Sequence, residues 1–444
     1  MSTTPTLDTA GAEHAIPDFA PGLARGPRWL RDARRSAAQI FNAAPFPRRG
    51  LHLWRYTDPA AFLAPHGSAA DHPPVEDRDA IIGLEKQHVD SGALAALAVD
   101  YAGREISTYG ADRLARRGVV IQPLSLAVDQ HGDLVEQHLY RLVGPDLGKF
   151  EALNAALWND GIFVYVPEGE TIDRPIHLFR EGGDRSSVYF PRLLVIVGRN
   201  AEITLIDEYA GGSEDVSGGV THVNGAVEIS AGDDSRVRYV SVQRHGAGVN
   251  MYLTHRAEIG RDARVLTVPL AIGGNITKQN FGVLLAGRGA DSRLRGMLFG
   301  SGGQHFDNHT LHAHGAGNST STIDFKTVLR DRAVSAYTGL IRIEQHAKTC
   351  EAYQENRNLL LNRGPKAETI PELEILNEDV KCTHGATIGP IDPESVFYLA
   401  SRGIPRDVAV RMIVSAFVEP TLRQIPDDLR GRLAEFIERR LEGL

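Results

Sequence analysis

Short strand-like runs broken by similar turns recur between residues 162 and 391, and this repetition restricts the possible folds more than any other feature of the chain. Glycine-led turns begin at Gly198, Gly232, Gly260 and Gly287, and looser versions begin at residues 330 and 363. These starts lie roughly 27–43 residues apart, a spacing typical of solenoid repeats. One coil cannot bury its inner face alone, so coils stack and share a core. The pattern predicts a mainly β protein with a parallel β-helix core over residues 161–391; a β-sandwich, which also has many short strands, is the alternative.

The segments before this core have a different composition. Residues 1–25 are rich in Ala, Pro, Thr and Gly without apolar periodicity, which predicts a flexible leader. Residues 26–160 mix Pro- and Gly-rich joints with short stretches of helical periodicity, such as residues 27–44. We expect this segment to form a helical and mixed α/β cap on the core.

Three helices are predicted after the core, over residues 392–444. Asp392 is suited to cap a first helix that Pro393 opens and Gly403 ends. Pro405 and Pro426 open the second and third helices. A helical C-terminal domain therefore follows the solenoid.

Charge and cysteine content argue against several classes of protein. The formal net charge of −8 disfavours a nucleic-acid-binding protein, which needs a basic surface. Only two cysteines occur, Cys350 and Cys382, too few for a disulfide framework or a four-thiolate cluster site, and they fit the reducing cytoplasm. The sequence has no apolar run of bilayer length, no secretory signal and no phosphate-binding P-loop.

Several motifs resemble one known family. The stretch KCTHGATIGPIDPESVFYLASRGIPRDVAVRMIVSAFVEP (residues 381–420) resembles the shared ending of the SufB/SufD family of iron–sulfur cluster assembly proteins. AYQENRNLLLN (352–362), IPELEILNEDVKC (370–382) and LWRYTD (53–58) resemble the SufD form. SufB has a cysteine at the position that matches Asn356 and a glutamate at the position that matches Gly385, so SufD is the better fit.

The resemblance implies a non-ATPase scaffold subunit of a SufBCD complex, and not an enzyme. Such a subunit pairs with SufB and docks SufC, the ABC-type ATPase, through its helical C-terminal domain. An iron–sulfur cluster would be present transiently in the complex, with no cofactor tightly bound to the chain alone; the residues do not decide whether a flavin binds. Two alternatives stay open: a carbohydrate-active β-helix enzyme, although no acidic cluster of that kind stands out, and a homo-oligomeric structural β-helix.

The resemblance points to His384 as a residue of the cluster-assembly interface. A neutral imidazole can bind iron, so His384 is a tentative metal ligand shared with SufB. Cys382 lies two residues earlier, which on a strand places both side chains on one face. A lone histidine beside a glycine is otherwise a turn residue, and a strand cysteine is otherwise a small buried apolar residue. Cys350 is offset from the cluster position and is not assigned that role.

Two further surfaces are expected to bind partners. Leu373 and Ile375 alternate along a strand near the end of the solenoid, whose unpaired edge could pair with SufB, or with itself in a homodimer. The resemblance assigns SufC binding to the first tail helix and its end, comprising Phe397, Tyr398, Leu399, Arg402 and Gly403. Packing of Phe397 and Leu399 onto the end of the solenoid is the alternative.

A histidine-rich segment, residues 304–321, looks like a metal-binding tract. On a strand, however, His312 and His314 share a face and His309 takes the other, so these side chains do not converge. We expect this segment to supply polar residues at inner or edge positions of a coil.

Overall fold

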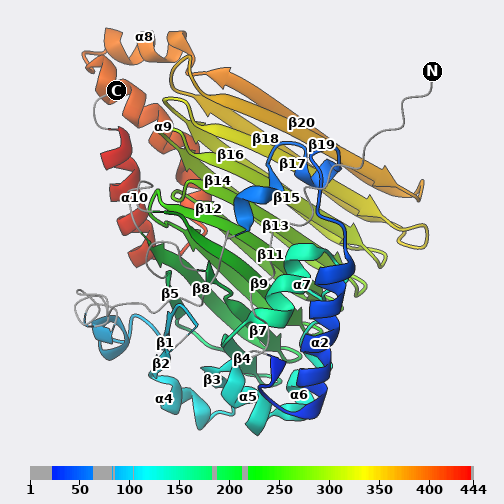
Figure 1. Ribbon diagram of the computed structural model, residues 1–444. Coiled ribbons are helices and arrows are strands. Elements are labelled where there is room, and N and C mark those ends of the chain that lie inside the picture. The colour runs from blue at the N-terminus through cyan, green and yellow to red at the C-terminus, as the bar shows by residue number, and fades with distance from the viewer. Residues whose placement is uncertain are drawn as a thin grey trace, which may run out of the picture.

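The computed structural model describes residues 23–63, 83, 86–103, 105–182, 188–212 and 219–441. Residues 1–22 of the predicted leader and residues 442–444 of the predicted tail lie outside this range. Two large sheets face each other along the molecule, with helices at one end and along one side (Figure 1).

Consecutive strands alternate between the two sheets, so each pair of strands makes one coil of a parallel β-helix of about eight coils. Sheet A contains, in spatial order, β2 (Glu105–Tyr109), β1 (Ala96–Tyr101), β5 (Ile176–Gly182), β8 (Glu202–Gly211), β10 (Arg236–Gln243), β12 (Arg264–Ala271), β14 (Asp291–Gly300), β16 (Thr320–Leu329), β18 (Cys350–Leu360) and β20 (Val380–Pro390). Sheet B contains β19 (Lys366–Ile375), β17 (Val334–Ile343), β15 (His305–His314), β13 (Ile276–Leu285), β11 (Val249–Ile259), β9 (Thr221–Ala231), β7 (Arg192–Val197), β4 (Ile162–Val166) and β3 (Val120–Pro123), and short β6 (Val188–Tyr189) also pairs with β9. The predicted parallel β-helix is confirmed, and the sandwich alternative is wrong.

The repeated turn has a physical explanation at two of its positions. Its third residue is left-handed, with φ of +53° at Asn200, +60° at Asp234 and +55° at Asp262, and Asn and Asp tolerate this region better than most residues. Its leading glycine packs against the turn of the preceding coil: a Cβ at Gly260 would lie 2.8 Å from the backbone nitrogen of Asp233. Stacked turns therefore require the sequence pattern that repeats.

The space between the sheets is a continuous apolar core. Alternate residues of each strand point inward, as Leu205, Val237 and Leu294 do from sheet A and Leu253 and Ile341 do from sheet B, all at most 1% exposed. The alternation seen in the sequence thus marks the inner face of each coil.

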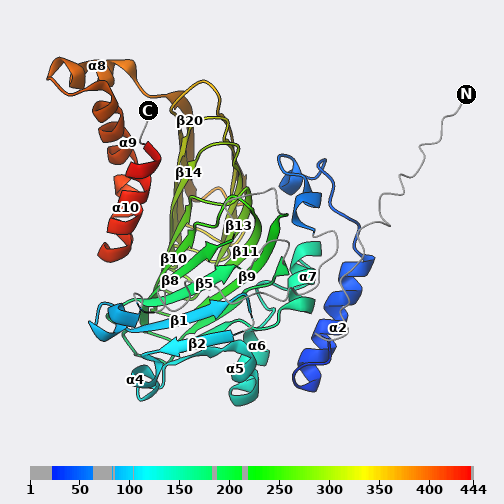
Figure 2. The same ribbon diagram turned by 60° about the vertical axis from the view of Figure 1, so that its left-hand side comes forward.

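The N-terminal region extends both sheets. β1 pairs in parallel with β5 and antiparallel with β2, while β3 pairs antiparallel with β4. Figures 1 and 2 place α4 (Ala111–Ala115), α5 (Leu124–Gln130) and α6 (Gly132–His138) at this end of the sheets. Longer α2 (Arg28–Ala43) packs against α7 (Lys149–Leu157) through small residues and Phe41.

Three helices end the described chain: α8 (Pro393–Ser401), α9 (Arg406–Leu422) and α10 (Asp427–Leu441). The outer face of sheet A presents an apolar strip that includes Val240, Val268 and Phe299, and α9 and α10 cover it with residues such as Val418 and Leu433. Figure 2 shows both helices lying along this side while α8 projects beyond them. None of the helices described has the length and apolar character required to cross a membrane.

Candidate functional site

The last coil of the solenoid, formed by β19 and β20, leaves two strand edges without a neighbour. β19 pairs only with β17, and β20 pairs only with β18, so each strand is the terminal strand of its sheet among the described residues. Backbone donors and acceptors on such edges can pair with a strand of another chain. β19 carries Pro371, which lacks a donor, and three glutamates, whereas Lys381 is the one Lys, Arg, Asp or Glu residue of β20.

His384 lies in the middle of β20, and not in a turn. It is directly in register with Gln354 of β18, which is fully buried and in turn pairs with buried Ile323 of β16. His384 therefore occupies an interior position of its coil. It is exposed because no further coil covers it.

Cys382 has the same orientation as His384, as the two-residue spacing predicted. It pairs in register with Ala352 and packs, half-buried, at the edge of the apolar core. Burial raises the pKa of its thiol. Among the described residues no group of three or more His, Cys, Asp and Glu side chains is placed to hold a metal ion. Cys382 and His384 could thus supply part of a metal site only.

Cys350 is placed differently. It is 1% exposed in the core, and its sulfur lies 3.2 Å from the hydroxyl oxygen of Ser319. Asn356, at the position where SufB has its cysteine, is also buried and donates a hydrogen bond to the carbonyl of Phe325 at 3.0 Å. Neither side chain reaches the uncovered end.

The predicted edge residues belong to this same last coil. Leu373 is half-buried against the core, while Ile375, the final residue of β19, is 37% exposed. Leu376 beside it and Ile388 of β20 are 45% and 46% exposed. The structure therefore brings Cys382, His384 and the predicted edge to one end of the molecule, together with exposed apolar side chains.

The tail patch, defined as Phe397, Tyr398 and Arg402, projects into solvent from α8 and its end. Phe397 is 75% exposed and Tyr398 57% exposed, and the Arg402 guanidinium lies 5.1 Å from the Tyr398 ring centre. Leu399 is half-buried, and Gly403 has φ of +84° where the helix ends. Phe397 therefore does not pack onto the end of the solenoid.

Local sequence explains why α8 begins and ends where it does. The Asp392 carboxylate accepts hydrogen bonds from the backbone N–H groups of Glu394 and Ser395, both at 3.1 Å, and Pro393 takes the first helical position. The predicted cap is confirmed. It fixes where α8 leaves the last coil.

The histidine-rich segment forms β15, and its side chains diverge as expected. His312 and His314 point into the solenoid and are fully buried, while His309 lies on the outer face with its Nε2 atom 2.9 Å from Asp307. His314 contacts the hydroxyls of Ser319 and Ser321. These histidines therefore occupy inner and outer positions of a coil and do not converge on one site.

The LWRYTD element lies on the outer face of sheet B, over a polar cluster that sequence reasoning missed. Trp54 stacks on Tyr252 with ring centres 5.5 Å apart. The Thr57 hydroxyl and the Lys278 ammonium both donate to one oxygen of Asp307, at 2.6 and 2.8 Å. Burial alone would raise the pKa of Asp307. The nearby Lys278 and His309 have the larger, opposite effect and hold that pKa well below its usual range. The sequence does contain a signal for this cluster: Lys278 and Asp307 lie 29 residues apart, at outward positions of adjacent coils.

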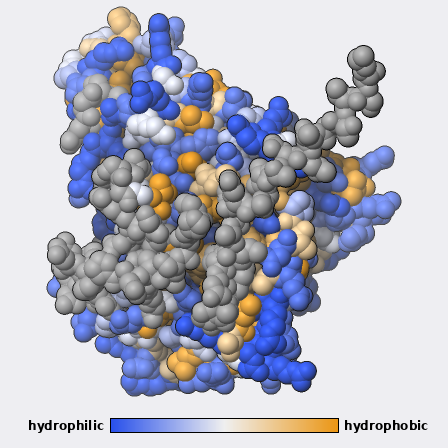
Figure 3. Space-filling model, in the orientation of Figure 1, coloured by the Kyte–Doolittle hydropathy of each residue, from blue (hydrophilic) through white to orange (hydrophobic). Residues whose placement is uncertain are grey.

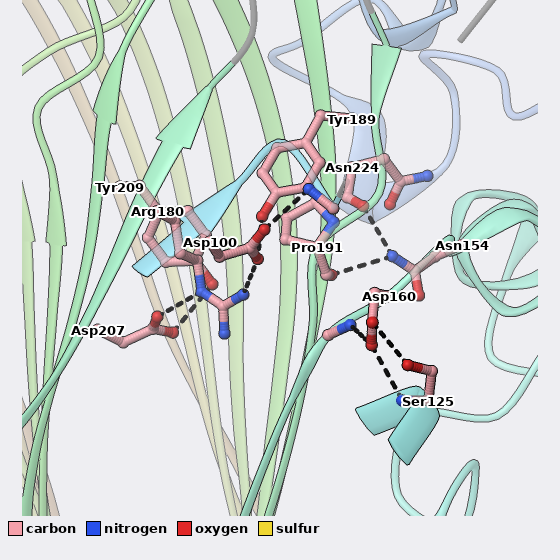
Figure 4. Close-up of polar contacts among 12 residues, drawn as sticks. Asp100, Ser125, Asn154, Asp160, Arg180, Tyr189, Pro191, Asp207, Tyr209 and Asn224 are labelled. Carbon is pink, nitrogen blue, oxygen red and sulfur yellow. Dashed lines mark hydrogen bonds and ion pairs between the residues drawn. The ribbon is translucent and has the colours of Figure 1, made fainter. Parts of the chain in front are cut away.

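A second buried polar cluster lies near the N-terminal end of the solenoid (Figure 4). Arg180 donates to Asp100 at 2.9 Å and to Asp207 at 2.6 Å, and all three side chains are fully buried. The Tyr189 hydroxyl donates a hydrogen bond to Asp100, and the Tyr209 hydroxyl donates one to Asp207. Burial raises the pKa of Asp100 despite the nearby guanidinium. These ion pairs and hydrogen bonds join β1, β5 and β8, so we read the cluster as a structural link between the first coils.

Two family models match the chain. The model described as "SufBD protein N-terminal region" matches residues 102–178, and "SUF system FeS cluster assembly, SufBD core domain" matches residues 179–417, more than half of the chain. The chain belongs to the SufB/SufD family. This SufB/SufD protein is therefore a component of the Suf system of iron–sulfur cluster assembly, and the family assignment supports neither the carbohydrate-active enzyme nor the purely structural β-helix.

Curated relatives of this SufB/SufD protein agree. It is 25% identical to the iron–sulfur cluster assembly protein SufB of Bacillus subtilis over 422 residues, which cover 94% of this chain and 90% of that protein. Iron–sulfur cluster assembly SufBD family proteins of Staphylococcus epidermidis and Staphylococcus haemolyticus are each 26% identical over the same shares. These relatives carry either the SufB name or the family name alone, so they identify the family.

Proposed function

We propose that this SufB/SufD protein is a SufD-type, non-ATPase scaffold subunit that pairs with SufB and docks SufC in the cytoplasm. The division into a cap (26–160), a β-helix (161–391) and a helical domain (392–444) then separates its tasks. The β-helix end faces SufB, and the helical domain binds SufC, which hydrolyses ATP. The cluster is the cargo of the complex.

One observation carries this proposal: His384 and Cys382 project from an uncovered last coil. Two ligands are too few for a cluster site, no larger ligand group occurs among the described residues, and a chain seated on that end could supply the others. Edge strands of 10 and 11 residues offer backbone pairing to such a chain. Exposed Ile375, Leu376 and Ile388 add apolar area around the histidine.

Buried Asn356 supports the SufD assignment. SufB has a cysteine at the matching position, and an asparagine that already donates to a backbone carbonyl offers no thiolate for sulfur. The exposed tail patch supports SufC docking, because aromatic and arginine side chains are common anchors at interfaces and Phe397 is 75% exposed.

The test is co-purification of the tagged chain with SufB and SufC from the same host. Ile388→Glu places a charge on the uncovered end, and we expect loss of SufB and retention of SufC. Leu284→Glu is the matched control, because Leu284 is similarly exposed, at 39%, on the outer face of β13. Equal SufB retention by both variants would place the pairing surface elsewhere.

A further inference from the structure

The outer face of sheet A changes character along its strands. On β10 and β12 the later outward residues, such as Val240 and Val268, are buried under α9 and α10. The first outward residues are Arg236, Arg238 and Arg264, all exposed. The helices therefore cover the apolar half of this face and leave a basic half open.

The open half is hollowed into a groove of about 540 Å³. Five arginines and one residue of the turn after α9 line it: Arg236, Arg238, Arg264, Arg293, Arg295 and Gln424. The acidic side chains that line the groove are Glu202 and Asp291, so its formal charge is +5 − 2 = +3. The chain as a whole carries −8. We call this feature the arginine groove.

Ion pairing within the fold satisfies only part of this charge. Arg293 pairs with Asp291 at 2.9 Å, Arg295 pairs with Asp324 at 2.8 Å, and Arg236 lies 3.7 Å from Glu202. Arg238 and Arg264 make no ion pair or side-chain hydrogen bond with the described residues. Two guanidinium groups are thus left for an outside anion.

The arrangement also carries a cost for folding. Arg236 and Arg264 are directly in register on neighbouring strands, and like charges placed opposite each other destabilise a sheet. Arg238 and Arg293 flank Leu266 in the next row of the same face. Nothing in the packing of the sheet requires arginine at these exposed positions.

We propose that the arginine groove docks an extended acidic segment of a partner protein. Neighbouring strands lie about 4.8 Å apart and next-but-one strands about 9.6 Å apart, and the long arginine side chains that they carry can reach carboxylates at alternate residues of an extended segment, about 6.6–7 Å apart. Arginine pairs with carboxylates through two parallel hydrogen bonds. This surface is separate from the last coil and the tail patch, so the proposal does not depend on SufB pairing or SufC docking.

Other ligand classes fit the groove less well. A small phosphate-bearing ligand is usually buried over most of its surface, whereas four of these arginines are exposed. The described residues that line the groove include no aromatic side chain on which a nucleobase could stack. A long nucleic acid would also meet the net negative charge of the rest of the chain.

Binding of a fluorescein-labelled 12-residue peptide of alternating Glu and Ser to the full chain, followed by anisotropy, tests the proposal. We expect Arg238→Glu with Arg264→Glu to weaken peptide binding at least tenfold, and raising salt from 50 to 300 mM to weaken binding to the parent protein. Arg238→Gln with Arg264→Gln, which adds no repulsion, should weaken it about threefold to fivefold. Arg113→Glu with Arg116→Glu, exposed arginines on and just after α4, is the control and should change affinity less than twofold.

Thermal melts of all variants verify that they are folded. Peptide affinity that changes less than twofold in both groove variants, or that falls equally in the control, overturns the proposal. Parallel titrations with tripolyphosphate and a labelled 12-nucleotide oligo-dT separate the other ligand classes. Tighter binding of either than of the peptide, lost in the groove variants, would overturn the acidic-segment proposal and assign the groove to phosphate.

Discussion

At the scale of single residues, the exposure of His384 follows from its place in a column of interior positions. Leu294, Ile323 and Gln354 occupy the same column in earlier coils and are fully buried. His384 is uncovered only because its coil is the last. A partner that continued the solenoid would bury this imidazole and exclude water from it.

We expect His384→Ala to lower cluster yield sharply without disturbing the fold. An exposed side chain beside Gly385 supports little packing, so the free energy of unfolding should change by no more than about 0.5 kcal/mol. Association with SufB and SufC should be nearly normal, and cluster formation in an anaerobic assay should fall. His384→Cys should restore part of the yield, because a thiolate also binds iron.

Cys382→Ala is the matched comparison for His384→Ala. Cys382 is half-buried at the core edge, and we expect a smaller loss of cluster than from His384→Ala. Parental cluster formation by His384→Ala, or loss of activity only because the complex dissociates, would remove His384 from the site.

The buried ion pair of Lys278 and Asp307 gives a prediction about stability, and not about cluster formation. Asp307→Ala leaves a buried ammonium without its counter-charge and should destabilise the fold by about 3–5 kcal/mol. Lys278→Met combined with Asp307→Leu removes both charges and should recover most of that loss. Glu168→Ala breaks the exposed pair with Arg199 and should leave stability nearly unchanged, because exposed ion pairs contribute little. Chemical denaturation of the parent and the three variants checks this; an Asp307→Ala variant as stable as the parent would contradict it.

At the scale of elements, the tail cannot be treated as a detachable module. α9 and α10 cover the apolar strip of sheet A, so removing residues 392–444 would expose that strip and would test solubility as much as SufC binding. Point changes in the tail patch avoid this difficulty because its side chains touch little of the protein.

We expect Phe397→Ala with Tyr398→Ala to weaken SufC binding at least tenfold while SufB stays bound. The physical reason is loss of two exposed aromatic anchors, which costs no core packing. Leu147→Ala, 49% exposed near the N-terminal end, is the control. Unchanged SufC affinity in a titration of the purified proteins would show that SufC binds elsewhere.

Sequence reasoning worked where local chemistry determines the element. The repeated turns were visible because left-handed residues such as Asp234 and close-packed glycines such as Gly260 restrict which residues can occupy each position. The first tail helix was visible because Asp392 and Pro393 form its cap. These signals lie within a few residues of the structure they produce.

Other features of the fold and the site could not be predicted from the sequence, because contacts between residues far apart in the chain determine them. Gly385 beside His384 suggested a turn, yet pairing with β18 keeps the chain extended to Pro390. Nothing local to β1 and β3 indicates that they extend the two sheets. Likewise, the arginines of the groove lie about 28 residues apart in sequence and meet only because coils stack.

At the scale of the whole molecule, the solenoid buries an unusual set of neutral histidines. Burial lowers the pKa of five of them, to about 4 for His222, His245 and His314 and to about 3 for His255 and His312. Among the residues that Figure 3 colours, hydrophilic ones cover most of the face shown, whereas these five histidines are buried. Unfolding returns each imidazole to water, where it takes up a proton near pH 6.5.

Stability should therefore fall as pH drops from 6.5 towards 4. The unfolded chain binds more protons than the folded one in this window, so each buried histidine costs about 1.4 kcal/mol of stability per pH unit. His312 gives the cleanest test, because its register neighbours Val283 and Ile341 are apolar and both its ring nitrogens lack a partner in the described structure. His312→Leu and His312→Gln differ in packing but should flatten the pH dependence of the urea midpoint between pH 7 and 5 equally. A slope unchanged in both variants would mean that His312 is not held neutral by the fold.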